Sequence, residues 1–136
     1  MQAQTVVRPA MTSAALSEND GNSRPLDLVH LSRQTLGDRA LEIELLGLFD
    51  KQAGQIMARL ASDLCGSDVK WRLDLSHTLK GSARAIGAMA VANAAQVYED
   101  ALAARQGAQE LRGHIDRLKL AVDEARAAIR DLLADA

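Results

Sequence analysis

The chain has few aromatic residues and a single cysteine. Its only aromatic side chains are Phe49, Trp71 and Tyr98, although hydrophobic residues make up 48% of its 136 positions. The core must therefore be built from Ala, Leu, Ile and Val, and this balance disfavours a β-rich fold and favours packed helices. The lone Cys65 excludes an internal disulfide framework.

An excess of basic charge and a long apolar run are also lacking. The 16 basic residues face 18 acidic ones, so the net charge is −2. This balance, together with the few aromatics, disfavours a nucleic-acid partner. No apolar run approaches the roughly 20 residues that span a bilayer, and residues 1–15 lack the continuous apolar segment of a secretory signal. We therefore expect a cytoplasmic protein without nucleic-acid or membrane partners.

The composition divides the chain into a tail and one domain. Residues 1–24 mix Gln, Thr, Ser, Asn and Gly without a sustained hydrophobic period, and we expect them to form a flexible N-terminal tail. Residues 25–136 have the length of one ordinary domain. The sequence therefore predicts a single folded unit after the tail.

Within that domain, helical periodicity recurs between short breaks. We expect five helices, at about 26–35, from the Asp38 cap to near Cys65-Gly66, from a Ser67 or Asp68 cap to about Ile86, at about 89–104, and at about 108–133. Every connection is short, so neighbouring helices should be antiparallel. The sequence predicts an all-α fold, an up-down antiparallel four-helix bundle with a short additional N-terminal helix.

His77 differs from His30 and His114 in its surroundings. Successive residues of a helix lie about 100° apart, so the segment around His77 has two faces. One face is a predicted core stripe, with Trp71 nearby: Leu75, Leu79, Ser82 and Ile86. The opposite face is predicted to be Leu73, His77, Lys80, Gly81, Arg84 and Ala88. We therefore expect the imidazole to point away from the core, with cations one and two turns onward.

Gly81 is an unusual residue for the interior of a helix. A glycine there costs roughly 1 kcal/mol relative to alanine. It leaves open space beside the predicted position of His77, and Lys80 and Arg84 place positive charge around that space. A neutral imidazole nitrogen, open space and nearby cations suit the acceptance of a phosphoryl group. The alternative is that Gly81 only permits close helix packing.

The following helix is predicted to bring a carboxylate to the same level. If the chain turns around residue 88, His77 lies 11 residues before the turn and Glu99 lies 11 residues after it. Each arm is then about 16 Å long, so Glu99 should lie near His77 and Gln96 about one turn away. A carboxylate that accepts the hydrogen of one imidazole nitrogen leaves the other nitrogen unprotonated and nucleophilic.

The segment His77-Thr78-Leu79-Lys80-Gly81-Ser82-Ala83, closed by Ile86-Gly87, resembles the signature of histidine-containing phosphotransfer (HPt) domains. The resemblance extends over about residues 26–134. It implies that His77 carries a phosphoryl group, that Lys80 assists and that Gly81 makes room. Glu99 is similar to the glutamate that orients the phosphorylated histidine in the related domain of chemotaxis kinases.

The resemblance also implies a mechanism. A phosphorylated aspartate of one receiver domain passes its phosphoryl group to the imidazole Nε2, which passes it to the aspartate of a second receiver. The receiver would bring Mg²⁺, so no cofactor is expected on this chain. The chain shows no nucleotide-binding motif and no pair of Glu-x-x-His motifs. We therefore expect neither autonomous kinase activity nor a metal site.

The remaining expectations concern partners. We place Arg84 with the chemical residues and assign Leu73, Gln96 and Ala88 to the binding of receiver domains of hybrid kinases and response regulators. The main hypothesis is a monomeric, stand-alone phosphotransfer protein, since its 136 residues begin at Met1. One alternative is a docking module that binds a receiver or kinase without relaying phosphate. Another is a fragment of a larger hybrid kinase.

Overall fold

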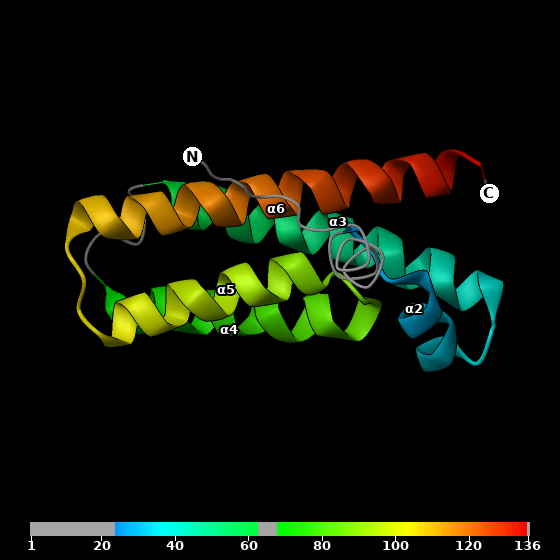
Figure 1. Ribbon diagram of the computed structural model, residues 1–136. Coiled ribbons are helices and arrows are strands. Elements are labelled where there is room, and N and C mark those ends of the chain that lie inside the picture. Colours follow the sequence, from blue (N-terminus) through cyan, green and yellow to red (C-terminus); the bar gives the residue numbers. More distant parts are fainter. Residues whose placement is uncertain (1–23, 63–67, 136) are drawn as a thin grey trace, which may run out of the picture.

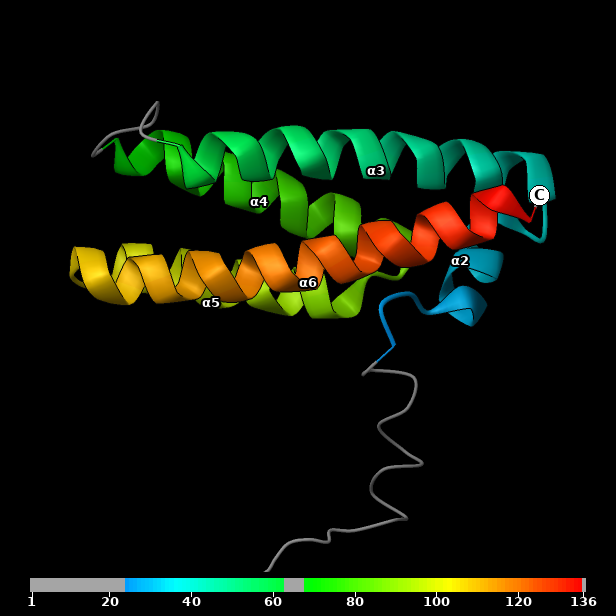
Figure 2. The same ribbon diagram turned by 90° about the horizontal axis from the view of Figure 1, so that it is seen from above.

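The computed structural model describes residues 24–62 and 68–135, and these residues form five helices and no strand. The helices are α2 (Leu28–Thr35), α3 (Arg39–Ala61), α4 (Val69–Ile86), α5 (Met89–Ala103) and α6 (Ala108–Ala134). Figures 1 and 2 show the four long helices side by side, with short α2 at one end. The all-α class is confirmed, whereas the strict up-down order stays a prediction. The expected tail lies outside the described residues, except for Arg24.

The four long helices enclose one core. Helix α3 packs against α4 and α6, α5 packs against α4 and α6, and α2 lies against α3 and α4. The largest side chains that are almost fully buried are Tyr98, Leu31, Leu46, Leu60, Leu79, Leu118 and Ile129. Buried alanines between them let the helices approach closely: Ala53, Ala83, Ala92, Ala95 and Ala125. The core is therefore mostly aliphatic, as the scarcity of aromatics predicted.

Three aspartates begin three of the helices. The Oδ1 atoms of Asp27, Asp38 and Asp68 each accept a hydrogen bond from the backbone N–H three residues onward, at 3.0 to 3.1 Å. Such bonds satisfy N–H groups that have no partner within the helix. The first helix therefore begins at Leu28 rather than at 26, because Asp27 is its N-cap.

The C-terminus of α3 differs from the expected position. The helix ends at Ala61, several residues before Cys65-Gly66. Ser62 adopts extended backbone angles, and its Oγ donates to the carbonyl oxygen of Arg59 at 2.9 Å. This bond satisfies a carbonyl of the last turn and competes with a further helical turn. Cys65, Gly66 and the alternative cap Ser67 lie outside the described residues.

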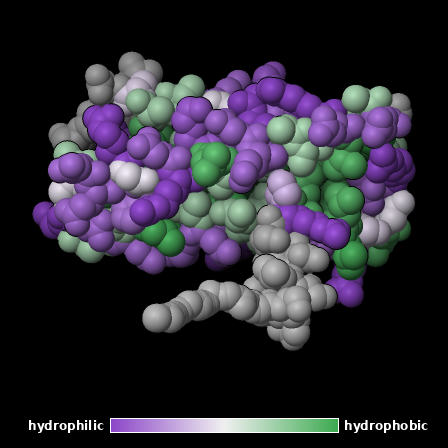
Figure 3. Space-filling view, turned by 45° about the horizontal axis from the view of Figure 1, so that its top comes forward, coloured by the Kyte–Doolittle hydropathy of each residue, from purple (hydrophilic) through white to green (hydrophobic). Residues whose placement is uncertain are grey.

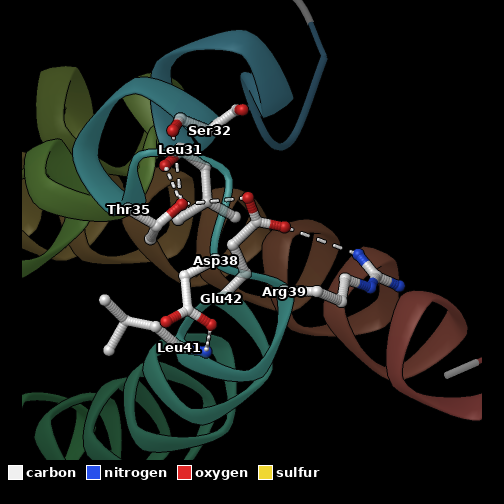
Figure 4. Close-up of polar contacts among 7 residues, drawn as sticks. All are labelled: Leu31, Ser32, Thr35, Asp38, Arg39, Leu41 and Glu42. Atoms are coloured by element: carbon white, nitrogen blue, oxygen red, sulfur yellow. Dashed lines mark hydrogen bonds and ion pairs between the residues drawn. The ribbon is translucent and has the colours of Figure 1, made fainter.

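Polar contacts fix the turn from α2 to α3 (Figure 4). Leu36 and Gly37 both have positive φ, 54° and 78°, and end α2. The buried Thr35 hydroxyl lies 3.0 Å from Glu42 Oε2 and 3.1 Å from the carbonyl oxygen of Leu31. A hydroxyl has one proton, so it donates to one of these oxygens at a time. The contact with Glu42 joins the last turn of α2 to the first turns of α3.

An ion pair links α3 to α6 on another side of the bundle. Arg126 Nε lies 2.6 Å from Asp50 Oδ1. A Cβ atom at Gly54 would lie 2.6 Å from Arg126 Nη1. Gly54 therefore leaves the space that the guanidinium of Arg126 occupies, which explains a glycine inside α3.

The described surface is largely polar on the face that Figure 3 presents, where hydrophilic side chains surround smaller apolar patches. No helix within residues 24–62 and 68–135 is both long enough and apolar enough to cross a membrane. Among these residues there is also no group of three or more His, Cys, Asp or Glu side chains placed to hold a metal ion.

Candidate functional site

The α4–α5 hairpin brings His77 and Glu99 together. Helix α4 ends at Gly87, which has a left-handed φ of 85°. A Cβ atom there would lie 2.6 Å from the carbonyl oxygen of Asp27, so both the backbone angle and the close approach of α2 require glycine. The backbone N–H of Asp27 donates to the carbonyl oxygen of Gly87 at 2.8 Å. The start of α2 therefore holds the turn that sets the register of the site.

A buried serine fixes the two helices beside the histidine. The Oγ of Ser76 donates to the carbonyl oxygen of Ala95 at 3.0 Å, and Ser76 is fully buried. Because Ser76 directly precedes His77, this bond sets how α4 lies on α5 at the site. The sequence prediction did not include Ser76. Its spacing of three and seven residues before Leu79 and Ala83 was the signal that it shares their buried stripe.

His77 presents its imidazole to solvent, as the sequence predicted. Its side chain is 72% exposed, and its Nδ1 lies 3.7 Å from Glu99 Oε1. This distance confirms that the two residues lie at the same level, but it is too long for a hydrogen bond. Since Nδ1 faces Glu99, Nε2 lies on the outer side of the ring. The nitrogen away from the carboxylate is therefore open to a partner.

Lys80 lies in a different environment from the one predicted. It is only 8% exposed, although the helical wheel placed it on the face opposite the core. Its Nζ lies 3.0 Å from Glu99 Oε1 and 2.9 Å from Gln96 Oε1. The wheel was wrong because α5 packs against this flank of α4 and covers it. The ammonium is therefore anchored beside His77 instead of being an ordinary solvated charge.

Glu99 joins the two charged groups of the site. Its side chain is 16% exposed, and the same oxygen, Oε1, faces both Lys80 and His77. Among the described residues this buried oxygen has the ion pair with Lys80 but no hydrogen bond of good geometry. It can therefore accept the N–H of the imidazole after a small rotation of the exposed ring. Contacts of catalytic groups are often long before a partner binds.

Gly81 and Arg84 lie on the exposed side of α4. A Cβ atom at Gly81 would meet no atom within 4 Å. This contradicts the alternative that Gly81 permits close helix packing, and it leaves open space on the surface one turn after His77. Arg84 is exposed and forms no ion pair with any described residue. Its guanidinium is therefore available to a partner.

The predicted binding residues have three different environments. Gln96 contacts Lys80, and Leu73 is half-buried and packs against the core. Ala88 is fully buried, so its assignment to a docking surface was wrong. The wheel of α4 does not apply to Ala88, because Gly87 ends the helix and Ala88 is the N-cap of α5.

The stripe that faces the core is also rotated from the predicted one. Ser82 is half-buried rather than central, and Trp71 is 36% exposed. The buried side of α4 consists of Ser76, Leu79, Lys80, Ala83 and Ile86. The arc is shifted toward α5 because α4 packs between α3 and α5. His77 lies just outside this arc, which places it next to buried polar groups while its ring stays in solvent.

Asp100 is a residue of the site that the sequence prediction missed. Its Oδ1 accepts a hydrogen bond from Gln96 Nε2 at 2.9 Å. The four-residue spacing from Gln96 was the available signal, since such residues are neighbours on a helix. A continuous set of polar contacts therefore extends from Asp100 through Gln96 and Lys80 to Glu99, beside His77.

Comparison with known proteins supplies the family. The model of the Hpt domain family matches residues 44–128, more than half of the chain. The match covers all of α4 and α5, and therefore His77, Lys80 and Glu99. No curated protein and no solved structure matches the chain. The chain belongs to the Hpt domain family, whose members are phosphotransfer intermediates of two-component phosphorelays.

Proposed function

We propose that this chain relays a phosphoryl group between the aspartates of two receiver domains through a phosphohistidine at His77. The observation that carries the proposal is the environment of the imidazole. Its side chain is 72% exposed, and its Nδ1 faces a buried carboxylate that also binds a buried lysine. The receivers of a hybrid sensor kinase and of a response regulator are the proposed partners, with the relay in the cytoplasm.

The proposed transfer begins with the lone pair of Nε2. It attacks the phosphorus of a receiver aspartyl phosphate, a bond forms between nitrogen and phosphorus, and the bond from phosphorus to the aspartate oxygen breaks. The aspartate leaves as a carboxylate with that electron pair. If Nδ1 keeps its hydrogen, the phosphorylated ring carries positive charge, which Glu99 stabilises from 3.7 Å. The reverse sequence delivers the group to the second receiver.

Lys80 and Gly81 support this transfer in different ways. The Lys80 ammonium is held within the Glu99 pair and supplies positive charge for phosphoryl oxygens. The open space at Gly81 admits the surface of a receiver close to the imidazole. We assign the Mg²⁺ that neutralises the phosphoryl group during transfer to the receiver.

A labelled receiver tests the proposal. Receivers phosphorylated with ³²P are mixed with the chain, and the label on the chain is then treated with acid and with alkali. The expected result is a label that is labile in acid and stable in alkali, as for phosphohistidine. Binding of receivers without any labelled chain would instead establish the docking module that does not relay phosphate.

Replacement of Gly81 should change stability and transfer in opposite directions. Gly81→Ala should raise the free energy of unfolding by up to about 1 kcal/mol, because the added Cβ meets no atom and alanine favours the helix. Gly81→Gln should slow transfer at least about tenfold, the equivalent of about 1.4 kcal/mol, by filling the approach to His77. Thermal unfolding and the rate of receiver-to-chain transfer measure the two effects.

Gly113→Gln is the matched control, since Gly113 lies inside α6 and a Cβ there also meets no atom within 4 Å. This variant should keep the transfer rate of the wild type. A loss of melting temperature at Gly81→Gln that accounts for its loss of transfer would show that Gly81 has only a structural role.

A further inference from the structure

The ammonium of Lys80 is held by two acceptors, and both belong to α5. They are Gln96 Oε1 at 2.9 Å and Glu99 Oε1 at 3.0 Å. A lysine ammonium has three N–H donors in a tetrahedral arrangement. Two acceptors on α5 therefore set the direction of the third donor as well. A lysine with a single acceptor would keep rotating about that contact.

The amide of Gln96 can satisfy its neighbours in one orientation only. Its Nε2 donates to Asp100 Oδ1 at 2.9 Å, while its Oε1 accepts from Lys80. A carboxylate only accepts hydrogen bonds and an ammonium only donates them. Turning the amide over would place donor against donor at Lys80 and acceptor against acceptor at Asp100. Asp100 therefore favours the orientation in which the oxygen of Gln96 faces the lysine.

We infer that Gln96 is a positioning residue for Lys80, and that Asp100 acts on Lys80 through the amide of Gln96. The inference rests on the proposed relay through His77, in which Lys80 binds the phosphoryl oxygens. Gln96 was predicted from the sequence to bind a receiver, whereas its contact with Lys80 assigns it a role inside the chain. Asp100 lies one turn further along α5 and is exposed.

Two substitutions at Gln96 separate positioning from receiver binding. Gln96→Met keeps the length of the side chain but removes the acceptor, and Gln96→Glu keeps an acceptor. Gln96→Met should lower the transfer rate at saturating receiver about 3- to 10-fold, the equivalent of one hydrogen bond. The receiver concentration for half-maximal rate should not change. Gln96→Glu should retain the rate within about twofold, because its carboxylate still accepts from Lys80.

Asp100 should matter only while residue 96 is an amide. Asp100→Ala should lower the saturating rate about twofold, since a glutamine and aspartate four residues apart interact weakly on a helix. In the Gln96→Glu background the same substitution should not lower the rate, because a carboxylate has no wrong orientation to correct. This loss of the Asp100 effect is the coupling that a double-mutant cycle measures.

An NMR measurement tests the positioning without any receiver. Lys80 is the one buried lysine of the chain, since Lys51, Lys70 and Lys119 are exposed. In ¹⁵N-labelled wild type, the Lys80 ammonium protons should exchange with water more slowly than those of the other lysines. Gln96→Met should accelerate this exchange, and Gln96→Glu should not.

The two measurements distinguish failure of the inference from failure of the relay. A wild type that accepts no phosphoryl group would overturn the relay, whereas the exchange rates would still report how Lys80 is held. Unchanged exchange in Gln96→Met would overturn the inference. So would a transfer defect seen only as a higher half-maximal receiver concentration, because it would show direct binding of the receiver by Gln96.

Discussion

Replacing His77 by glutamine should abolish phosphoryl acceptance and leave the fold unchanged. Glutamine has no nucleophilic ring nitrogen, so transfer from a phosphorylated receiver should fall at least about a thousandfold, to background, as when a nucleophile is removed. The side chain of His77 is 72% exposed, so the free energy of unfolding should change by less than about 0.5 kcal/mol. A labelled receiver and thermal unfolding measure the two quantities.

The other histidines provide matched controls. His30→Gln and His114→Gln should both keep the label, because neither residue lies beside the polar contacts of the site. His114 Nε2 lies 3.0 Å from Gln106 Oε1, near the start of α6, and the backbone N–H of His30 bonds to Asp27 at the start of α2. Full acceptance by His77→Gln would contradict the assignment of the phosphoryl group to His77.

Replacing Lys80 by methionine should impair both transfer and stability. The substitution removes the partner of Glu99, whose side chain is 16% exposed, and leaves its carboxylate unpaired. The free energy of unfolding should fall by about 2–3 kcal/mol, since an unpaired charge in a mostly buried position is costly. The saturating transfer rate should fall about 10²- to 10³-fold, as when one preorganised group is removed from a developing charge.

A second substitution separates these two effects. In Lys80→Met combined with Glu99→Gln, residue 99 is neutral and no longer requires a cation. The double variant should therefore recover more than half of the lost stability, as denaturant unfolding will show. Transfer should stay low, because no ammonium is restored beside His77. Recovery of transfer together with stability would show that Lys80 acts only through the fold.

The level of His77 and Glu99 could be predicted because it depends on chain geometry alone. Gly87 ends α4 with a left-handed residue, and the two helical arms on either side of Ala88 have equal length. The rise per residue of a helix is constant, so equal arms bring their ends together. The resulting distance of 3.7 Å confirms that this simple count positions a functional pair.

The environment of Lys80 could not be predicted from the pattern of α4. A helical wheel shows which residues share a face, but it does not show which neighbouring helix covers each flank. Helix α5 covers the flank of Lys80, so a charged side chain became buried and paired. Asp100 was missed for a related reason, because its contact with Gln96 depends on the position that Lys80 adopts.

Where the bundle ends was also beyond the helical pattern. Apolar periodicity in the second helix favours an extension toward Cys65, yet α3 ends at Ala61, where the side chain of Ser62 bonds to the backbone. Ala88 appears on the face of His77 only if α4 continues past Gly87. Local side-chain and backbone chemistry decided both positions, and a periodic pattern does not contain it.

The most direct test of the account is to locate the phosphorus atom on the chain. The chain labelled with ¹⁵N in its histidines is phosphorylated by a receiver, and coupling between ³¹P and ¹⁵N is measured by NMR. The account predicts coupling at Nε2 of His77 and at no other histidine nitrogen. Coupling at Nδ1 of His77, at His30 or at His114, or phosphorus on another residue type, would contradict it.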